Sequence, residues 1–218
     1  MEIDVILKSR FPDLKPLMLY INDVKVQKRD GDLETFKVEV IKQIRKDYDL
    51  DSVKDHPTFR AYRDFFWGIG IDPTKNRPAA EALTRRILSG KKIPSINTLV
   101  DVYNIASVKT GIALATFDTD KLEGNILLRF AEKGEQILVI GTEKPVMLKG
   151  GEIVVSDKEK LIAIYPYRDA NNTKVTEETK NVTIIICGVP GIQKKTLETA
   201  SAITKQLMIR FCDGQNSL

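Results

Sequence analysis

The stretch I-P-S-I-N-T-L-V-D-V-Y-N-I-A-S-V-K-T-G-I-A-L-A-T-F-D (93–118) decides the fold of this chain. Its pattern predicts a helix, a glycine stop and a short strand. Asn97, Asp101 and Asn104 stand four and then three residues apart. A helix therefore places them on one narrow face, as a row of two amides and one carboxylate. Such a row suits binding a polar ligand, or holding a neighbouring loop in a structural hydrogen-bond network.

Helical and strand patterns surround this stretch. Ser95 is the predicted N-cap of its helix and Gly111 the residue that ends it. Apolar residues at helical spacing predict further helices at 33–48, 77–88 and 194–211. Short apolar runs separated by turn residues predict strands at 2–7, 17–21, 127–130, 136–140, 153–155, 161–165 and 182–187. We therefore expect an α+β fold with mixed helices and a mainly antiparallel sheet.

A polar connection at 49–58 is the one candidate boundary. It predicts an N-terminal α/β segment (1–58) packed on a main domain (59–218). One continuous domain over 1–218 is the alternative.

The composition is that of an ordinary soluble globular protein, with 42% hydrophobic and 29% charged residues among 218. There is no apolar run of about 18 residues, so we expect no membrane span. Cys187 and Cys212 lack C-x-x-C spacing and His56 is the only histidine, which argues against a metal site and histidine-based triads. Gly-rich phosphate loops are also absent. We expect a cytoplasmic protein without metal or cofactor.

The excess positive charge is concentrated in one segment. Residues 61–110 hold 8 basic and 4 acidic side chains, whereas the rest of the chain is balanced. The residues that we expect to bind RNA phosphates are Arg77, Arg85, Arg86, Lys91 and Lys92. A solvated helix face is the alternative. Glu81 and Arg85 form an i,i+4 pair that is either an exposed salt bridge or an inward-turned arginine oriented by the glutamate.

The motifs of the middle of the chain resemble a known family. P-S-I-N-T-L-V-D-V-Y-N (94–104) followed by G-I-A-L-A-T-F-D (111–118) is similar to the editing module, or B3/B4 domain, of the phenylalanyl-tRNA synthetase beta subunit. The likeness continues through D-T-D-K-L-E-G-N-I-L-L-R (118–129), A-E-K-G-E-Q-I (131–137) and G-G-E-I-V-V-S-D (150–157). It covers roughly 60–190 of this sequence. No other part of a synthetase is visible, so the chain resembles a free-standing editing module.

The resemblance implies hydrolysis of a mischarged aminoacyl-tRNA, with the aminoacylated 3′ end of tRNA as partner. Water attacks the ester at the terminal ribose, which needs hydrogen-bond donors for the developing oxyanion and a pocket that reads the amino acid. No metal is required. A non-catalytic module that kept the fold and binds RNA or an amino acid is the alternative. Hydrolysis or racemisation of a free small molecule has no specific support in the sequence.

Two positions depart from the family pattern. Ala115 stands where the family has a histidine, and Tyr103 where it has a threonine, both at the amino-acid pocket. A specificity for tyrosine therefore cannot be transferred to this chain. The lost histidine favours the non-catalytic alternative.

The candidate site residues follow from the matching motifs and from one strand end. Asn97, Asp101 and Asp118 match the family pattern and are the candidate catalytic residues, with a structural network around the pocket as the alternative. The Arg168-Asp169 strand end could bind a phosphate or carboxylate through its arginine, or form an Arg–Asp pair that fixes a loop. The expected substrate-pocket residues are Asn104, Tyr103, Ala115, Arg168, Asp169 and Glu152.

Overall fold

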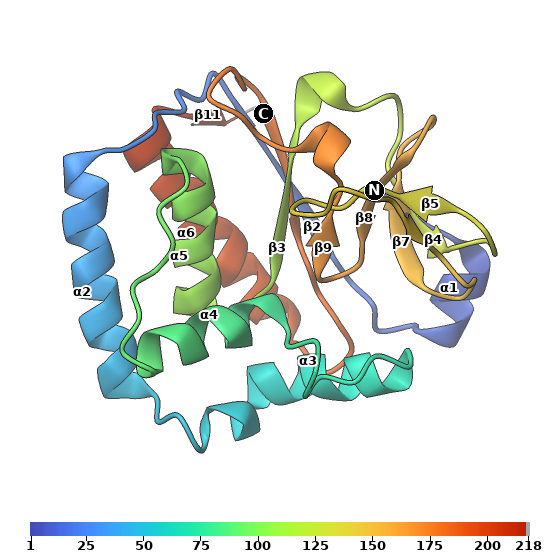
Figure 1. Ribbon diagram of the computed structural model, residues 1–218, viewed down its shortest axis with the longest axis horizontal. Helices are drawn as coiled ribbons and strands as arrows, with labels where there is room; N and C mark the ends of the chain where they lie inside the picture. The colour runs from blue at the N-terminus through green and yellow to red at the C-terminus, as the bar shows by residue number, and fades with distance from the viewer. Residues whose placement is uncertain (217–218) are drawn as a thin grey trace.

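Residues 1–216 of the computed structural model are described here; helices predominate in the first half of the chain and short strands in the second, which ends with one long helix (Figure 1). The α-helices are α1 (Val5–Arg10), α2 (Gly31–Asp47), α3 (Pro57–Gly68), α4 (Ala79–Leu88), α5 (Thr98–Thr110) and α6 (Lys194–Cys212). The strands are β1 (Glu2–Ile3), β2 (Leu17–Asn22), β3 (Leu114–Asp118), β4 (Leu127–Phe130), β5 (Gln136–Ile137), β6 (Val146–Met147), β7 (Ile153–Ser156), β8 (Leu161–Ile164), β9 (Arg168–Asp169), β10 (Val182–Ile186) and β11 (Gln215–Asn216).

The strands form two larger sheets and one small one. The four-stranded sheet has the order β11-β2-β10-β3 and is antiparallel throughout. The five-stranded sheet has the order β1-β4-β7-β8-β9, in which only the β1–β4 pair is parallel. Strands β5 and β6 pair with each other. The predicted α+β class with mainly antiparallel pairing is therefore confirmed.

The N-terminal segment is joined to the rest of the chain through both sheets. Strand β1 pairs with β4 of the five-stranded sheet, and β2 lies between β10 and β11 of the four-stranded sheet. The predicted strand at 2–7 was wrong, because the chain turns into helix α1 after two strand residues. The cause is local: the Asp4 carboxylate accepts hydrogen bonds from the backbone N–H groups of Ile6 and Leu7 and caps that helix.

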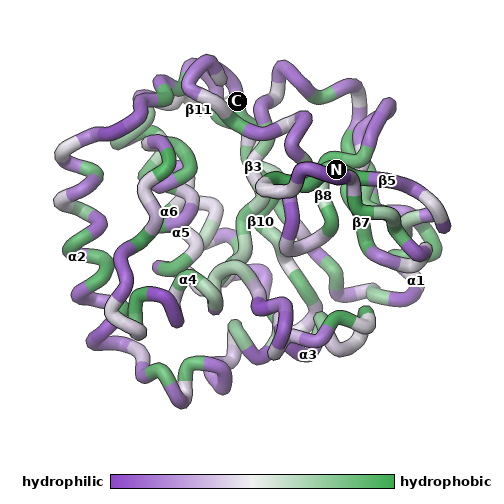
Figure 2. Tube along the Cα trace, in the orientation of Figure 1, coloured by the Kyte–Doolittle hydropathy of each residue, from purple (hydrophilic) through white to green (hydrophobic). Residues whose placement is uncertain are grey.

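The core lies between the four-stranded sheet and a pair of helices. In Figure 1, α5 and α6 stand side by side against β3 and β2, and the five-stranded sheet occupies the other side of the molecule. Figure 2 shows hydrophobic residues along β7, β8 and β10 and on the inner helices, and hydrophilic residues along the outer surface of α2. The aromatic cluster at 59–67 is largely core, since Phe59, Tyr62 and Phe66 are buried and only Trp67 is exposed. None of the described helices is long and apolar enough to cross a membrane.

Two glycines are required by the backbone. Gly111 ends α5 in the left-handed conformation, with φ of 73°, as the sequence predicted. Gly188 follows β10 where the chain passes against β2: a Cβ there would lie 2.3 Å from the carbonyl oxygen of Lys15. The first glycine sets the direction in which β3 leaves the helix, and β3 carries part of the site described next.

Candidate functional site

A small cavity lies where β3, the edge strand of the four-stranded sheet, meets helices α4 and α5 and the chain around β9. Its volume is about 160 Å³. The residues that line it are Ala79 and Leu83 of α4, Tyr103, Asn104 and Ser107 of α5, Leu114 and Ala115 of β3, and Pro166, Tyr167 and Asp169 around β9. A cavity of roughly 150 Å³ holds one benzene molecule. This one therefore has room for a group of about the size of an amino-acid side chain.

Helix α5 supplies the neutral polar groups of the cavity. The side chains of Asn97, Asp101 and Ser107 on this element are each hydrogen-bonded within the protein. Tyr103 and Asn104 are half-buried and line the cavity without such a bond to another residue of the described chain. Burial raises the pKa of the Tyr103 hydroxyl, so it stays protonated at neutral pH and can donate a hydrogen bond. Both side chains are therefore available to a ligand.

Asp169 supplies the one acidic group of the cavity. Burial raises the pKa of its carboxyl to about 7, and the nearby backbone N–H of Thr116 offsets part of that shift. Within residues 1–216, no lysine or arginine forms an ion pair with this carboxylate. Near neutral pH the group therefore exists in both protonation states.

Asn97 and Asp101 lie outside the cavity and hold the start of α5. The helix begins at Thr98 with Asn97 as its N-cap, which accepts a hydrogen bond from the Val100 N–H at 2.9 Å. The prediction of Ser95 as the N-cap was wrong. Ser95 Oγ instead accepts a hydrogen bond from Lys37 Nζ at 2.9 Å, so it is part of a cluster in front of the helix.

Asp101 belongs to the same cluster. Its carboxylate forms a buried ion pair with Lys37 of α2 and accepts a hydrogen bond from the Ile96 N–H at 2.9 Å. Both charged side chains are 4% exposed. Asp101 therefore fixes α5 against α2, and the expected row of Asn97, Asp101 and Asn104 is divided: only Asn104 reaches the cavity.

Asp118 also lies outside the cavity, at the far end of β3. Its carboxylate accepts a hydrogen bond from Thr179 Oγ1 at 2.8 Å and lies 3.2 Å from Lys121 Nζ. It also caps the short 3₁₀ turn 119–121 through the Asp120 N–H. These contacts hold the chain that follows β3 against the loop before β10.

Glu152 and Arg168 lie behind the cavity wall rather than in it. Glu152 accepts a hydrogen bond from the Lys149 N–H at 2.9 Å. The pKa of Tyr167 is raised, mainly by burial and to a smaller extent by the charge of Glu152. Arg168 is exposed, with its guanidinium 5.9 Å from the Tyr167 ring centroid. Because neighbouring strand residues point to opposite faces, Arg168 and Asp169 form no pair with each other.

A basic hollow lies next to the cavity, on another side of α4. Its volume is about 410 Å³. Its lining residues are Lys75, Arg77, Ala82, Arg85, Arg86, Ser89 and Lys91. Lys92 is exposed beside it, and its carbonyl accepts a hydrogen bond from Arg86 Nε at 2.7 Å. Four of the five arginines and lysines predicted to bind RNA therefore line one concave surface.

Glu81 fixes the geometry of this hollow. Its carboxylate is fully buried and binds Arg63 at 3.0 Å and Arg85 at 2.9 Å. Arg85 also donates a hydrogen bond to the carbonyl of Leu50 at 3.1 Å. Of the two interpretations of the Glu81–Arg85 pair, the structure has the inward-turned arginine.

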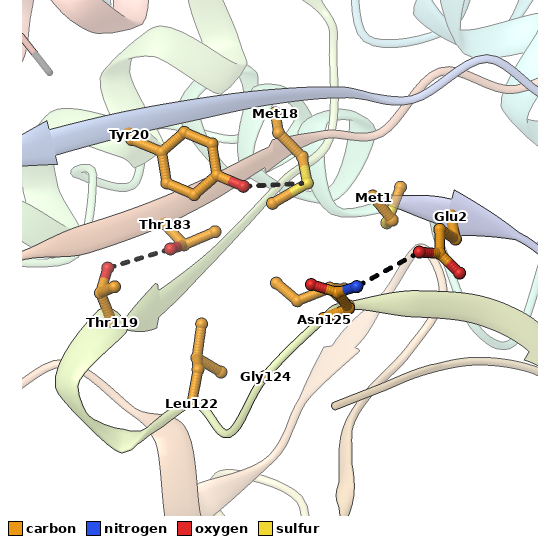
Figure 3. Close-up of a pocket in the computed structure, with 10 residues that line it drawn as sticks. Met1, Glu2, Met18, Tyr20, Thr119, Leu122, Gly124, Asn125 and Thr183 are labelled. Carbon is orange, nitrogen blue, oxygen red and sulfur yellow. Dashed lines mark hydrogen bonds between the residues drawn. The ribbon is translucent and has the colours of Figure 1, made fainter. Parts of the chain in front are cut away.

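A third hollow, of about 280 Å³, lies at the far end of β3 between the two sheets (Figure 3). Its polar side chains are paired with one another. Thr119 and Thr183 hydroxyls are 2.9 Å apart, and Asn125 donates a hydrogen bond to Glu2 at 3.3 Å. The Tyr20 hydroxyl points toward the sulfur of Met18, 3.6 Å away. The cavity at Asp169 differs because the side chains of Tyr103 and Asn104 have no hydrogen-bond partner among the described residues and Asp169 has no ion pair there. Among the described residues no group of three metal-binding side chains is found.

Comparison with known proteins identifies the family. The family model for the B3/4 domain matches residues 61–213. The chain belongs to the B3/4 domain family. The matched segment contains α4, α5, β3 and β9, and hence every element that lines the cavity.

Individual relatives support this assignment. The chain is 42% identical over 88 residues to the phenylalanine–tRNA ligase beta subunit of Fusobacterium nucleatum, covering 40% of this chain and 11% of that subunit. The subunit of Idiomarina loihiensis is 35% identical over 113 residues, covering 52% of this chain and 14% of its own length. The chain therefore matches less than a fifth of these curated relatives. An N-terminal fragment of the phenylalanyl-tRNA synthetase beta subunit from Pyrococcus horikoshii has the same fold, with a TM-score of 0.51 and 14% identity over 98% of this chain and 49% of that one.

Four of the residues expected in a substrate pocket lie together at this cavity: Tyr103, Asn104, Ala115 and Asp169. That the cavity is the substrate pocket stays a prediction. The cavity is also lined by residues that were not predicted for a pocket: Ser107, Leu114, Pro166 and Tyr167, and the α4 residues Ala79 and Leu83. The last two had a signal in their spacing, since residues four apart share one face of a helix.

Proposed function

We propose that this B3/4 domain hydrolyses mischarged aminoacyl-tRNA supplied in trans. One observation carries the proposal: the cavity and the basic hollow share helix α4. Ala79 and Leu83 face the cavity, whereas Ala82, Arg85 and Arg86 lie roughly a quarter turn around the helix. A ligand with phosphates in the hollow and an amino acid in the cavity would span one helix diameter of about 10 Å. An aminoacylated RNA 3′ end has that chemistry.

The cavity supports ester hydrolysis by water. The reaction needs a donor for the oxyanion that forms on the carbonyl oxygen, and polar groups that place the water. The Tyr103 hydroxyl and the Asn104 amide are the donors available within the cavity. We infer that Asn97, Asp101 and Asp118 act as positioning residues, because they hold α5 and the end of β3, the two elements that carry Tyr103, Asn104 and Ala115. Glu152 and Arg168 would support the wall formed by Tyr167.

Substrate specificity should differ from that of the synthetase module. Ala115 and Tyr103 replace a histidine and a threonine at the amino-acid pocket, so both volume and hydrogen bonding change. A site built to bond a substrate hydroxyl rejects analogues that lack it by roughly 10⁴–10⁵. We therefore expect tyrosine attached to the phenylalanine tRNA to be a poor substrate.

The test of hydrolysis is a panel of mischarged tRNAs with the full chain. Release of one amino acid well above the uncatalysed rate supports the enzyme, and loss of that release in Asn104→Ala would locate it in the cavity. Tyrosine on the phenylalanine tRNA as the best substrate would contradict our interpretation of Ala115 and Tyr103.

The RNA contact has its own test. Each neutralised duplex phosphate adds about 0.9 to the slope of log K against log salt. Replacing Lys75, Arg77 and Lys91 by alanine should flatten the slope for tRNA, because these exposed cations line the hollow without the buried pairing of Arg85. The matched control replaces the exposed Lys133, Lys144 and Lys149 and removes the same charge elsewhere. Equal slopes for the two triple variants would mean that the hollow is only a solvated surface.

A non-catalytic module that binds RNA or an amino acid is the second candidate. The specific observation in its favour is that the three expected catalytic residues are bonded outside the cavity, while Ala115 brings no imidazole into it. Binding of tRNA without cleavage of any member of the panel would select this candidate.

A further inference from the structure

Asp169 is a half-buried carboxylate of the cavity wall and, unlike the fully buried carboxylates of the described chain, it has no basic partner. The four carboxylates that are buried outright are Glu81, Asp101, Asp118 and Asp157. Each of them lies against a lysine or arginine: Arg63 and Arg85, Lys37, Lys121 and Lys160 in that order. Asp169 has no such cation: the backbone N–H of Thr116 is near its carboxyl, and the residue lines the cavity. The position that a cation fills at the other four sites is therefore open to a ligand here.

The rest of the cavity wall restricts what that ligand can be. Tyr103 and Asn104 are neutral, and Leu83, Leu114 and Ala115 are apolar. No lysine or arginine is among the lining residues. A ligand with a carboxylate would meet one negative group and no positive one. The wall thus fits a small molecule with a positive charge at one end and a neutral polar group beside it.

We propose that the Asp169 carboxylate binds the α-ammonium group of an amino acid whose carboxyl group is esterified, so that the cavity accepts aminoacyl esters and rejects both N-acylated esters and free amino acids. This inference rests on the proposed function, because it names the substrate class of the same cavity. It also accounts for product release. Hydrolysis converts the ester to a free amino acid, and the negative charge of Asp169 repels the new carboxylate of that product. Asp169 acts here as a binding residue and no proton transfer is assigned to it.

The groups around Asp169 leave it as the one that titrates near neutral pH. Tyr103 of α5 and Cys187, which follows β10, lie near the Asp169 charge, and Tyr167 precedes it by two residues; burial raises the pKa of all three. They remain uncharged while Asp169 ionises near pH 7. Arg168 is exposed and lies on the opposite face of the strand from Asp169. Affinity for an α-ammonium ligand should therefore rise through pH 7, and fall once the ligand amine loses its proton near pH 8.

The decisive experiment measures binding without turnover. The probes are L-amino-acid amides, which cannot be hydrolysed as esters, together with their N-acetyl derivatives and the free amino acids, titrated into the full chain by calorimetry or NMR. We expect the amides to bind, and the N-acetyl forms and free amino acids to bind at least 10-fold more weakly. Asp169→Asn should weaken amide binding by about 10- to 100-fold, as for a lost hydrogen bond to a charged group. The matched control is Asp64→Asn, at an exposed aspartate paired with Arg60.

The outcomes separate this inference from the proposed function. If amide binding depends on Asp169 but no tRNA is deacylated, the role of Asp169 is supported and the proposed hydrolysis is contradicted. Cleavage of N-acetyl-aminoacyl-tRNA as fast as the free-amine form keeps the enzyme and overturns the inference. Equal binding of amides and N-acetyl amides by the unmodified protein, or no binding of either, also overturns it. These comparisons stand even where Asp169→Asn fails to fold.

Discussion

Carboxylates are paired in the helices around the cavity and left unpaired in the cavity wall; we call the helices α2, α4 and α5, with their buried ion pairs, the frame. In the frame, Asp101 is paired with Lys37, and Glu81 with two arginines. In the wall, Asp169 has no basic partner among the described residues, and burial raises its pKa to about 7. A charge neutralised inside the protein fixes elements to one another. A shielded charge without a partner destabilises the folded protein. It contributes to binding specificity only when a ligand supplies the opposite charge. The following predictions test that contrast.

Removing a carboxylate from the frame should have the largest effect. Asp101→Ala leaves the Lys37 ammonium buried with Glu34 and Ser95 as its remaining partners. Breaking a buried ion pair costs about 3–5 kcal/mol, and the remaining Glu34 places this case near 3 kcal/mol. Denaturant unfolding measures it. A double variant, Lys37→Met with Asp101→Leu, should recover most of the loss, and a loss below about 1 kcal/mol for the single variant would contradict the role of the pair.

Removing the unpartnered carboxylate should stabilise the protein above neutral pH. The folded pKa of Asp169 is about 7, above its ordinary value, so the folded state binds the extra proton. The contribution of this group to stability is therefore lost as pH rises from about 4 to about 7, by at most about 4 kcal/mol. Asp169→Asn should remove this dependence and be the more stable protein at pH 8. Unfolding of both proteins at pH 5 and pH 8 checks it, and parallel curves would show that the group is not buried in solution.

Asn97 allows the structural role of the α5 N-terminus to be tested with an uncharged side chain. Its side chain caps α5, and replacing a cap by alanine costs about 1 kcal/mol. Asn97→Asp or Asn97→Ser restores the acceptor and should restore both stability and any ligand affinity. A catalytic Asn97 would instead lose turnover in all three variants while the two capped ones stay stable.

The smallest effect is expected at an exposed pair. Arg60 and Asp64 lie four residues apart on α3, with side chains 62% and 57% exposed. Arg60→Ala should change the free energy of unfolding by no more than about 0.5 kcal/mol, with less effect still at high salt. A larger change would mean that ion pairing at the surface matters as much as it does in the frame.

Local patterns predicted the elements better than the contacts between them. The stop at Gly111, the helix at 194–212 and the strands around β7 and β8 each follow from a few neighbouring residues. The first helix was missed because the capping carboxylate of Asp4 outweighed an alternating pattern. Ser95 and Asn97 are equally good caps by sequence, and only packing against Lys37 decides between them.

The site was predicted in part for the same reason. The family motifs identified Tyr103, Asn104 and Ala115, which a helix and the strand after it bring to one cavity. Asp101 shares their motif, but Lys37, 64 residues away in sequence, turns it into a frame residue. The strand end at Arg168-Asp169 was expected at the pocket through its arginine, but the β8–β9 pairing places Asp169 at the cavity and leaves Arg168 exposed.

Helix α4 has a consequence for how the two hollows respond to ligands. Because the same helix forms a wall of each, a ligand that displaces α4 from one side changes the shape of the other. Any such coupling must be reciprocal: if RNA in the basic hollow raises the affinity of the cavity by some factor, an occupied cavity raises the affinity for RNA by the same factor. Titrations with a tRNA that carries no amino acid and with an amino-acid amide, separately and together, would measure the free energy of coupling between the two sites.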